Sequence, residues 1–188
     1  MQLIRCDVPS PLGDIAVIAR DAGPQRDGPV VAIGFADCWP RLAGLLARRD
    51  AGYELSEGSL DQAAHALERY FSGDCEALDA VSIDSGGTAF QRRVWRRLMR
   101  VPAGETISYA GLAAAIGSPA AARAVGTANA TNPISLVVPC HRVVRTGGEV
   151  GEYSGGATRK AWLLRHEAAH AEPVLRQNDT PLLQTQSV

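Results

Sequence analysis

Hydrophobic residues alternate with polar and small ones near the start of the chain, a pattern typical of half-buried strands. The alternating apolar positions are Ile15, Val17, Val31, Ile33 and Phe35. A segment rich in glycine, proline and aspartate, residues 21–29, separates the two runs and favours a turn. The pattern therefore predicts a β-hairpin over residues 11–36.

Apolar residues then recur at helical spacing between Leu60 and Phe71. Ser59 and Gln62 have the spacing of a capping box, in which two side chains bond the free backbone N–H groups at the start of a helix. Gly73 follows as a stop signal. The sequence therefore predicts a helix between Ser59 and Gly73.

The segment after this helix ends the first structural unit. Val81 and Ile83 predict one more short strand, and Ser85-Gly86-Gly87 forms a natural break. We expect residues 1–86 to be an N-terminal α/β support domain with a small antiparallel sheet and a packed helix. Nothing in this unit resembles catalytic chemistry.

The second unit has helical periodicity. Thr88 and Gln91 form a capping box, and Phe90, Val94 and Leu98 recur every fourth residue on one face of a helix. We expect this helical second domain to cover residues 87–172, and together with the sheet of the first domain it predicts an α+β fold class. Residues 173–188 are polar and predict a loose tail.

Two short helices follow, joined by a tight turn. Ser108 caps the first, Gly117 closes it, and Ser118 with Pro119 starts the second, which covers residues 120–126. This arrangement predicts a helix-turn-helix. Arg123 is the only charged residue in the second helix. A packing helix with a surface arginine is the alternative.

The net charge of −1 conceals an uneven distribution. Residues 1–87 carry 7 arginines and 14 acids, whereas residues 88–145 carry one acid, Glu105, and 8 arginines: Arg92, Arg93, Arg96, Arg97, Arg100, Arg123, Arg142 and Arg145. A polyanionic partner for the middle segment is indicated, although a solvated arginine-rich face gives the same count. With no apolar run of about 18 residues and no apolar leader, we expect no membrane span and a cytoplasmic protein.

The cysteines identify the candidate chemistry. No C-x-x-C pair links Cys6, Cys38, Cys75 and Cys140, so a disulfide framework is not expected, and zinc bound by Cys6, Cys38 and a distant histidine is a minor alternative. Cys140 differs because His141 follows it, directly after an apolar run. A thiol needs a base or cation nearby to become the attacking thiolate. The pair predicts a nucleophile beside a segment suited to nucleic acid.

The chain resembles the O6-alkylguanine-DNA alkyltransferases, also called methylated-DNA–protein-cysteine methyltransferases. The motifs that carry the resemblance are Phe90-Gln91, Val94-Trp95, Pro102-x-Gly104, Ser108-Tyr109, Ala121-Ala122-Arg123-Ala124-Val125-Gly126, Asn132-Pro133, Pro139-Cys140-His141-Arg142-Val143, Gly151-x-Tyr153-Ser154-Gly155-Gly156, Lys160, Leu163-Leu164 and Glu167. The N-terminal half matches only through Ser10-Pro11-Leu12-Gly13. Glu152 departs from the glycine or asparagine of many members.

The resemblance implies a fold and a reaction. The first domain would be RNase H-like and the second winged-helix-like. The protein would bind double-stranded DNA from the minor groove, flip out O6-alkylguanine (or O4-alkylthymine) and transfer the alkyl group irreversibly to Cys140, once per chain. No cofactor and no metal are implied. We expect a monomer, and cooperativity on DNA is an open alternative.

The resemblance also implies roles for the residues around the thiol. Cys140 is the nucleophile, His141 its base through a water, and Glu167 the group that orients His141. Tyr109 donates toward N3 of the leaving guanine, and Asn132 braces the cysteine turn. With this base beside it, the Cys140 thiol is expected to have a pKa well below the free value of about 8.5.

A second set of residues is implied in recognition of DNA and the flipped base. Arg123 fills the vacated space in the duplex, and small side chains beside it let the helix approach the groove. The backbone carbonyls of Cys140 and Val143 and the amide of Ser154 read the guanine edge. The remaining residues of this set are Ala121, Ala122, Gly126, Tyr109 and Tyr153.

Three other functions are compatible with parts of this pattern. A non-catalytic relative that binds alkylated guanine typically has tryptophan in place of the cysteine, so Cys140 argues against it. A helix-turn-helix transcription regulator would protect specific DNA sequences. A cysteine hydrolase would turn over many times, whereas an alkyl acceptor is consumed one to one.

Overall fold

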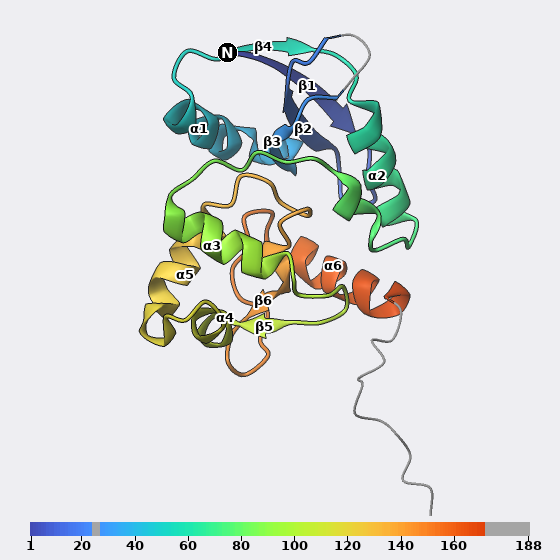
Figure 1. Cartoon of the computed structure of the whole chain (residues 1–188). Helices are drawn as coiled ribbons and strands as arrows, with labels where there is room; N and C mark the ends of the chain where they lie inside the picture. Colours follow the sequence, from blue (N-terminus) through green and yellow to red (C-terminus); the bar gives the residue numbers. More distant parts are fainter. Residues whose placement is uncertain (24–26, 172–188) are drawn as a thin grey trace, which may run out of the picture.

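A four-stranded sheet forms the first part of the chain in the computed structural model, which describes residues 1–23 and 27–171 (Figure 1). The strands, in the order β3-β2-β1-β4, are β1 (Gln2–Val8), β2 (Ile15–Arg20), β3 (Val30–Phe35) and β4 (Glu54–Glu57). The predicted hairpin is confirmed as the antiparallel pair β2–β3. The prediction of a wholly antiparallel sheet is wrong, because β4 runs parallel to β1.

Helix α1 (Trp39–Arg49) explains the parallel pair. It connects β3 to the opposite edge of the sheet, so the chain enters β4 in the direction of β1, as a crossover connection allows. Its Leu42 and Leu46 pack on one face of the sheet against Leu3 and Ile18. The sequence analysis missed α1, whose arginine-rich sequence buries only these two leucines.

The other face of the sheet packs against α2 (Asp61–Phe71) and the second part of the chain in one continuous core. The predicted Ser59–Gln62 capping box does not form. The carboxylate of Asp27 instead accepts hydrogen bonds from the backbone N–H groups of Gln62 (2.8 Å) and Ala63 (3.2 Å). A cap supplied from a distant loop leaves no local sequence signal.

The edge of β3 holds two later segments. Val30 pairs with Ile83 in a single bridge, and Ile33 pairs with Ile134 in another. The predicted strand at Val81 and Ile83 is therefore wrong: a 3-10 helix (Ala77–Ala80) precedes this one bridge. The bridge at Ile134 matters for function, because it anchors the segment that leads to Cys140 directly on the sheet.

The second part is helical, as predicted (Figure 1). It contains α3 (Ala89–Leu98), α4 (Tyr109–Ala115), α5 (Ala122–Ala130), α6 (Ala157–His170) and a parallel pair of short strands, β5 (Ile107–Ser108) and β6 (Val143–Val144). The Thr88–Gln91 capping box and the Ser108 cap are confirmed. The α+β fold class is therefore confirmed.

The start of α5 differs from the prediction. Ser118 does not cap a helix; its hydroxyl accepts a hydrogen bond from Arg93 at 3.0 Å. A 3-10 turn (Pro119–Ala121) intervenes before α5, which runs four residues beyond the expected end at Gly126. Helices α4 and α5 still pack on each other across a short turn. Their use as a DNA-binding helix-turn-helix stays a prediction.

Two predictions concern larger features. The expected tail, residues 173–188, lies outside the described residues. No helix within 1–23 and 27–171 is long and apolar enough to cross a bilayer. The division at residues 86 and 87 stays a prediction, and the core that runs through both parts shows that they pack as closely as elements of one domain.

Candidate active site

A tight turn presents Cys140. The side-chain amide of Asn132 donates to the carbonyl of Val138 at 2.8 Å and accepts from the N–H of Ile134 at 3.0 Å, so it ties the two ends of the turn together. Leu136 has a φ of 72°, a left-handed conformation that is costly for a branched side chain. The role of Asn132 in bracing the cysteine turn for the reaction stays a prediction.

Cys140 lies in the wall of a cavity of about 360 Å³. The cavity is lined by Arg41, Tyr109, Gly126, Asn129, Ala130, Cys140, Glu152, Tyr153 and Ser154. Five of these were predicted site residues: Tyr109, Gly126, Cys140, Tyr153 and Ser154. The fold therefore brings together residues that the sequence separates by 45 positions, in a space large enough for a flat heterocycle.

Arg41 is a residue that sequence reasoning missed. It comes from α1, and its guanidinium donates to the carbonyl oxygens of Ala130 (2.5 Å) and Asn132 (3.1 Å). Because α1 itself was not predicted, no sequence signal pointed to Arg41. The first part, which we expected to act as support, therefore contributes a residue to the cavity lining, and Arg41 ties α1 to the cysteine turn.

Asn129 is a second missed residue. Its side-chain amide donates to the carbonyl of Cys140 at 3.3 Å, and its Oδ1 is buried with no hydrogen-bond partner among the described residues. A buried amide oxygen without a partner is costly and suits a donor that arrives later. The available signal was a polar residue on the buried side of α5, one turn beyond Val125.

A buried network of charges lies behind the thiol. Nε2 of His141 is 2.8 Å from Oε1 of Glu167. Arg142 donates to both oxygens of this carboxylate, each at 2.9 Å, and to the carbonyl of Val101 at 2.5 Å. Tyr70 adds a further hydrogen bond, from its hydroxyl to Oε1 at 2.8 Å. His141 and Glu167 are fully buried, so water does not screen the network.

This network places a hydrogen on Nε2 of His141. Burial alone would raise the pKa of Glu167, but the neighbouring His141 and Arg142 outweigh it and hold that pKa far below its ordinary range. Since Glu167 is ionised and can only accept, Nε2 of His141 carries the hydrogen. Whenever the ring is neutral, Nδ1 is the acceptor, and it is buried with no partner among the described residues. The free lone pair is what a base for the thiol requires.

The thiol itself differs from the prediction. Cys140 is 3% exposed, and burial raises its pKa, although hydrogen bonding to Asn132 and the charges of Arg41 and Lys160 act in the opposite direction. The expected pKa well below 8.5 is therefore wrong for the protein alone. The physical reason is desolvation, which penalises a buried thiolate.

Tyr109 and Val143 lie in the protein interior or at the cavity, whereas Arg123, Ala121 and Ala122 lie outside the cavity. Tyr109 is half-buried, and burial raises the pKa of its phenol, so it faces the cavity as a neutral donor. The carbonyl of Val143 accepts from Lys160 at 2.5 Å. Arg123 is exposed and does not line the cavity, and Ala121 and Ala122 lie next to it on the half-exposed start of α5.

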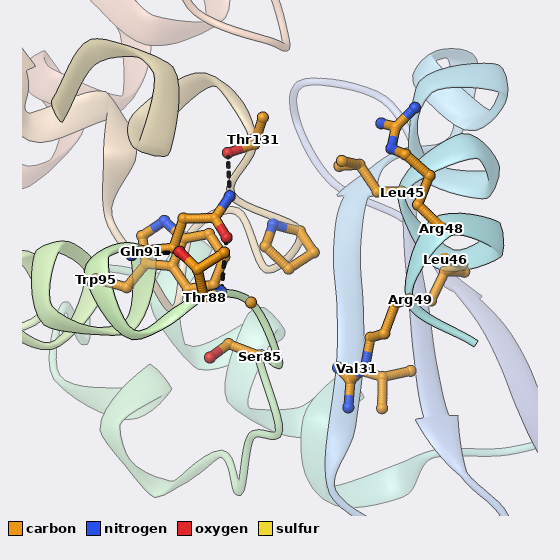
Figure 2. Close-up of a pocket in the computed structure, with 12 residues that line it drawn as sticks. Val31, Leu45, Leu46, Arg48, Arg49, Ser85, Thr88, Gln91, Trp95 and Thr131 are labelled. Atoms are coloured by element: carbon orange, nitrogen blue, oxygen red, sulfur yellow. Dashed lines mark hydrogen bonds between the residues drawn. The ribbon is translucent and has the colours of Figure 1, made fainter. Parts of the chain in front are cut away.

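A second cavity, of about 390 Å³, lies between α1 and α3 (Figure 2). Several of its polar lining groups are already paired: Gln91 bonds both Thr88 and Thr131, and Arg49 binds Asp84. No cysteine lines it. This cavity therefore offers no reactive group.

No cluster of three or more metal-binding side chains occurs in residues 1–23 and 27–171. This includes the surroundings of Cys6 and Cys38, which the sequence analysis considered as zinc ligands. The thiols of all four cysteines are free.

Comparison with known proteins identifies the family. A model of the 6-O-methylguanine DNA methyltransferase DNA-binding domain matches residues 89–169. The methylated-DNA–protein-cysteine methyltransferase of Shigella flexneri is 40% identical over 170 residues, which cover 89% of this chain and 96% of that protein. The chain belongs to this family.

Solved structures of the family share the fold. Mycobacterium tuberculosis O6-methylguanine methyltransferase superposes with a TM-score of 0.70 at 32% identity, covering 91% of this chain and 96% of that one. The structure of M. tuberculosis OGT in complex with DNA superposes with a TM-score of 0.69 at 33% identity, and the match covers 92% of this chain and 96% of that one. The name of the S. flexneri relative refers to a protein cysteine. Cys140 is the only cysteine within the matched residues 89–169 of this methyltransferase.

The first prediction concerns Glu167→Gln. The substitution leaves Arg142 as a buried charge without its anion, and we expect a loss of about 3–5 kcal/mol in the free energy of unfolding at pH 7, measured by urea denaturation. Because the folded pKa of Glu167 is depressed, its stabilisation is complete above the unfolded value of about 4.3 and is lost as the pH falls toward the folded value. The difference from wild type should therefore narrow below about pH 4.

Glu68→Gln is the matched control, because the Glu68 side chain is 66% exposed. We expect it to change stability by at most about 0.5 kcal/mol. A Glu167→Gln protein as stable as this control would contradict the view that the carboxylate holds the network together.

Proposed function

We propose that this methyltransferase repairs O6-alkylguanine in double-stranded DNA by moving the alkyl group to its own Cys140. The observation that carries the proposal is that Cys140 lines the cavity, while Nδ1 of the next residue, His141, is buried with no hydrogen-bond partner among the described residues. The first step is proton transfer from the thiol to His141, through a bridging water. The resulting imidazolium is stabilised by Glu167.

The bond changes balance without a cofactor. Sγ of Cys140 forms a bond to the alkyl carbon while the bond from that carbon to O6 breaks, and the electron pair stays with the guanine. In this proposal Tyr109 donates a hydrogen bond to N3 of the leaving base, where negative charge develops, and its position in the cavity lining supports this role. The guanine ends by taking up one proton. The thioether is stable, so each chain reacts once.

The base must leave the duplex to reach a thiol that is 3% exposed. Arg123 is exposed near the start of α5, outside the cavity, and it suits a role in filling the space that the base vacates. Ala121, Ala122 and Gly126 leave room for the DNA backbone at this end of α5. The carbonyls of Cys140 and Val143 read the guanine edge in this proposal. Before the base enters, the Cys140 carbonyl accepts from Asn129 and from the Val143 N–H, and the Val143 carbonyl accepts from Lys160.

Several finer points belong to the same proposal. The protein contacts the minor groove of DNA through α4 and α5, and it also accepts O4-alkylthymine as a substrate. It acts as a monomer in the cytoplasm and needs no cofactor. The arginine-rich segment 88–145 supports contact with a polyanion. The division into residues 1–86 and 87–172 is also proposed here.

The second prediction tests the acceptor. Incubation with a duplex that contains O6-methylguanine should add one methyl group to each chain, on the peptide that holds Cys140, as read by mass spectrometry. Cys140→Ser should abolish transfer and retain DNA binding. Cys6→Ser is the control and should react like wild type. Methylation of another cysteine, or many turnovers per chain, would contradict the proposal.

The third prediction concerns base extrusion. Arg123→Ala should slow repair of duplex O6-methylguanine by at least about ten-fold, since extrusion costs a few kcal/mol of unstacking. Reaction with free O6-benzylguanine, which needs no extrusion, should keep its wild-type rate. Arg100→Ala removes another exposed arginine and should affect neither rate so strongly. Equal slowing of both substrates by Arg123→Ala would show that the residue does not assist extrusion.

A further inference from the structure

Tyr70 brings a hydroxyl from α2 to the carboxylate behind the active site. The residue is fully buried, and its Oη donates to Oε1 of Glu167 at 2.8 Å. Burial, followed by the negative charge of Glu167, raises the pKa of the Tyr70 phenol well above its ordinary range. The hydroxyl therefore stays protonated at any pH the protein tolerates and acts only as a donor to Glu167.

This hydroxyl competes with His141 for one oxygen. Oε1 of Glu167 accepts from Tyr70 (2.8 Å), from His141 (2.8 Å) and from Arg142 (2.9 Å), whereas Oε2 accepts from Arg142 alone. A carboxylate oxygen offers two lone pairs, so three donors share them. Each donor draws charge from the oxygen, and the hydrogen bond to Nε2 of His141 is weaker than it would be without the other two.

We propose that Tyr70 is a positioning residue for alkyl transfer: its hydroxyl shares the carboxylate oxygen that holds His141 and so limits the basicity of the imidazole. The proposal rests on the roles of Cys140 and His141 given above. A base works best when its proton affinity matches the working pH, because it must release the proton after accepting it. Tyr70 would set that balance from the N-terminal part of the chain.

The position of the Tyr70 ring does not depend on its hydroxyl. His166 donates from Nε2 to the Tyr70 carbonyl at 2.8 Å, and the ring packs edge-on against Phe71 and His166, with centroid distances of 5.2 and 5.4 Å. Removal of the hydroxyl should therefore leave the ring in place. The effect of Tyr70→Phe then reports the hydrogen bond rather than a change in packing.

The other charged or titratable groups nearby are accounted for. Arg142 and Cys75 lie close enough to Tyr70 to influence its titration, and His166 touches its ring. Around the thiol, the charged and titratable groups are Arg41, Lys160, Tyr153 and Tyr109. All of these are retained when only the Tyr70 hydroxyl changes.

The experiment measures how fast iodoacetamide labels Cys140 in the full chain across a range of pH, with the labelled peptide quantified by mass spectrometry. Tyr70→Phe should lower the apparent pKa of Cys140 by about half a unit or more, roughly three-fold in the proton equilibrium, because a more basic His141 takes the thiol proton at lower pH. Site-specific 3-fluorotyrosine at position 70 is a stronger hydrogen-bond donor of nearly the same shape, and it should raise the apparent pKa of Cys140.

Two controls separate this role from a structural one. Tyr53→Phe alters a tyrosine that packs on the opposite face of the sheet and should not shift the profile. In a His141→Ala background, Tyr70→Phe should lose its effect on the profile, because it acts through the imidazole. An unchanged profile, shifts in the same direction for both Tyr70 variants, or a shift that persists without His141 would overturn the proposal.

The fluorotyrosine protein keeps every packing contact, so the test stands even if Tyr70→Phe unfolds. Iodoacetamide needs neither DNA nor an alkylated base. If the predicted shifts occur but no methyl group is taken from O6-methylguanine DNA, the inference about Tyr70 holds and the proposed repair activity fails. If methyl transfer occurs without the shifts, the reverse is true.

Discussion

The carboxylate of Glu167 is the charge on which the rest of the site depends. An ion without solvent is tolerated only when its neighbours replace water, and here His141, Arg142 and Tyr70 supply four hydrogen bonds. The carboxylate in turn fixes which nitrogen of His141 carries the hydrogen. Three elements meet at this point: α2 through Tyr70, the cysteine turn through His141 and Arg142, and α6 through Glu167 itself. The geometry of the thiol and its base follows from how these elements pack.

The N-terminal part contributes more to the site than support. Arg41 from α1 ties the cysteine turn and lines the cavity, and the edge of β3 pairs with Ile134 just before that turn. Arg159 of α6 is bound in return by Asp37, at 2.8 Å. A cavity assembled from both parts is rigid only when both are folded. This coupling explains why one continuous core, and not two separate ones, underlies the site.

Local sequence signals predicted the local features well. The caps at Thr88 and Ser108 depend on residues three positions apart, and the structure confirms both. The cap of α2 by Asp27 was not predicted, because it joins residues 35 positions apart. The parallel strand β4 was missed for a similar reason, since its partner β1 is about 50 residues away and its own residues are mostly exposed.

The candidate site shows the same division. Motif resemblance predicted the positions of Cys140, His141 and Glu167, and the structure brings Tyr109, Tyr153 and Ser154 around the same cavity. It could not predict Arg41, Asn129 or Tyr70, which carry no motif of their own and reach the site through tertiary packing. Nor could it predict the raised pKa of the thiol. Desolvation depends on how deeply the thiol is buried, and a cysteine–histidine pair in a sequence does not show this.

The tautomer of His141 tests the account most directly. Nitrogen-15 NMR of the protein with labelled histidines, with the His141 signals assigned by their loss in His141→Ala, distinguishes a hydrogen on Nε2 from one on Nδ1. The account predicts that the neutral ring carries its hydrogen on Nε2, held by Glu167, and leaves Nδ1 bare. A neutral ring with its hydrogen on Nδ1 would contradict it, because His141 could then neither donate to Glu167 nor accept the proton of Cys140.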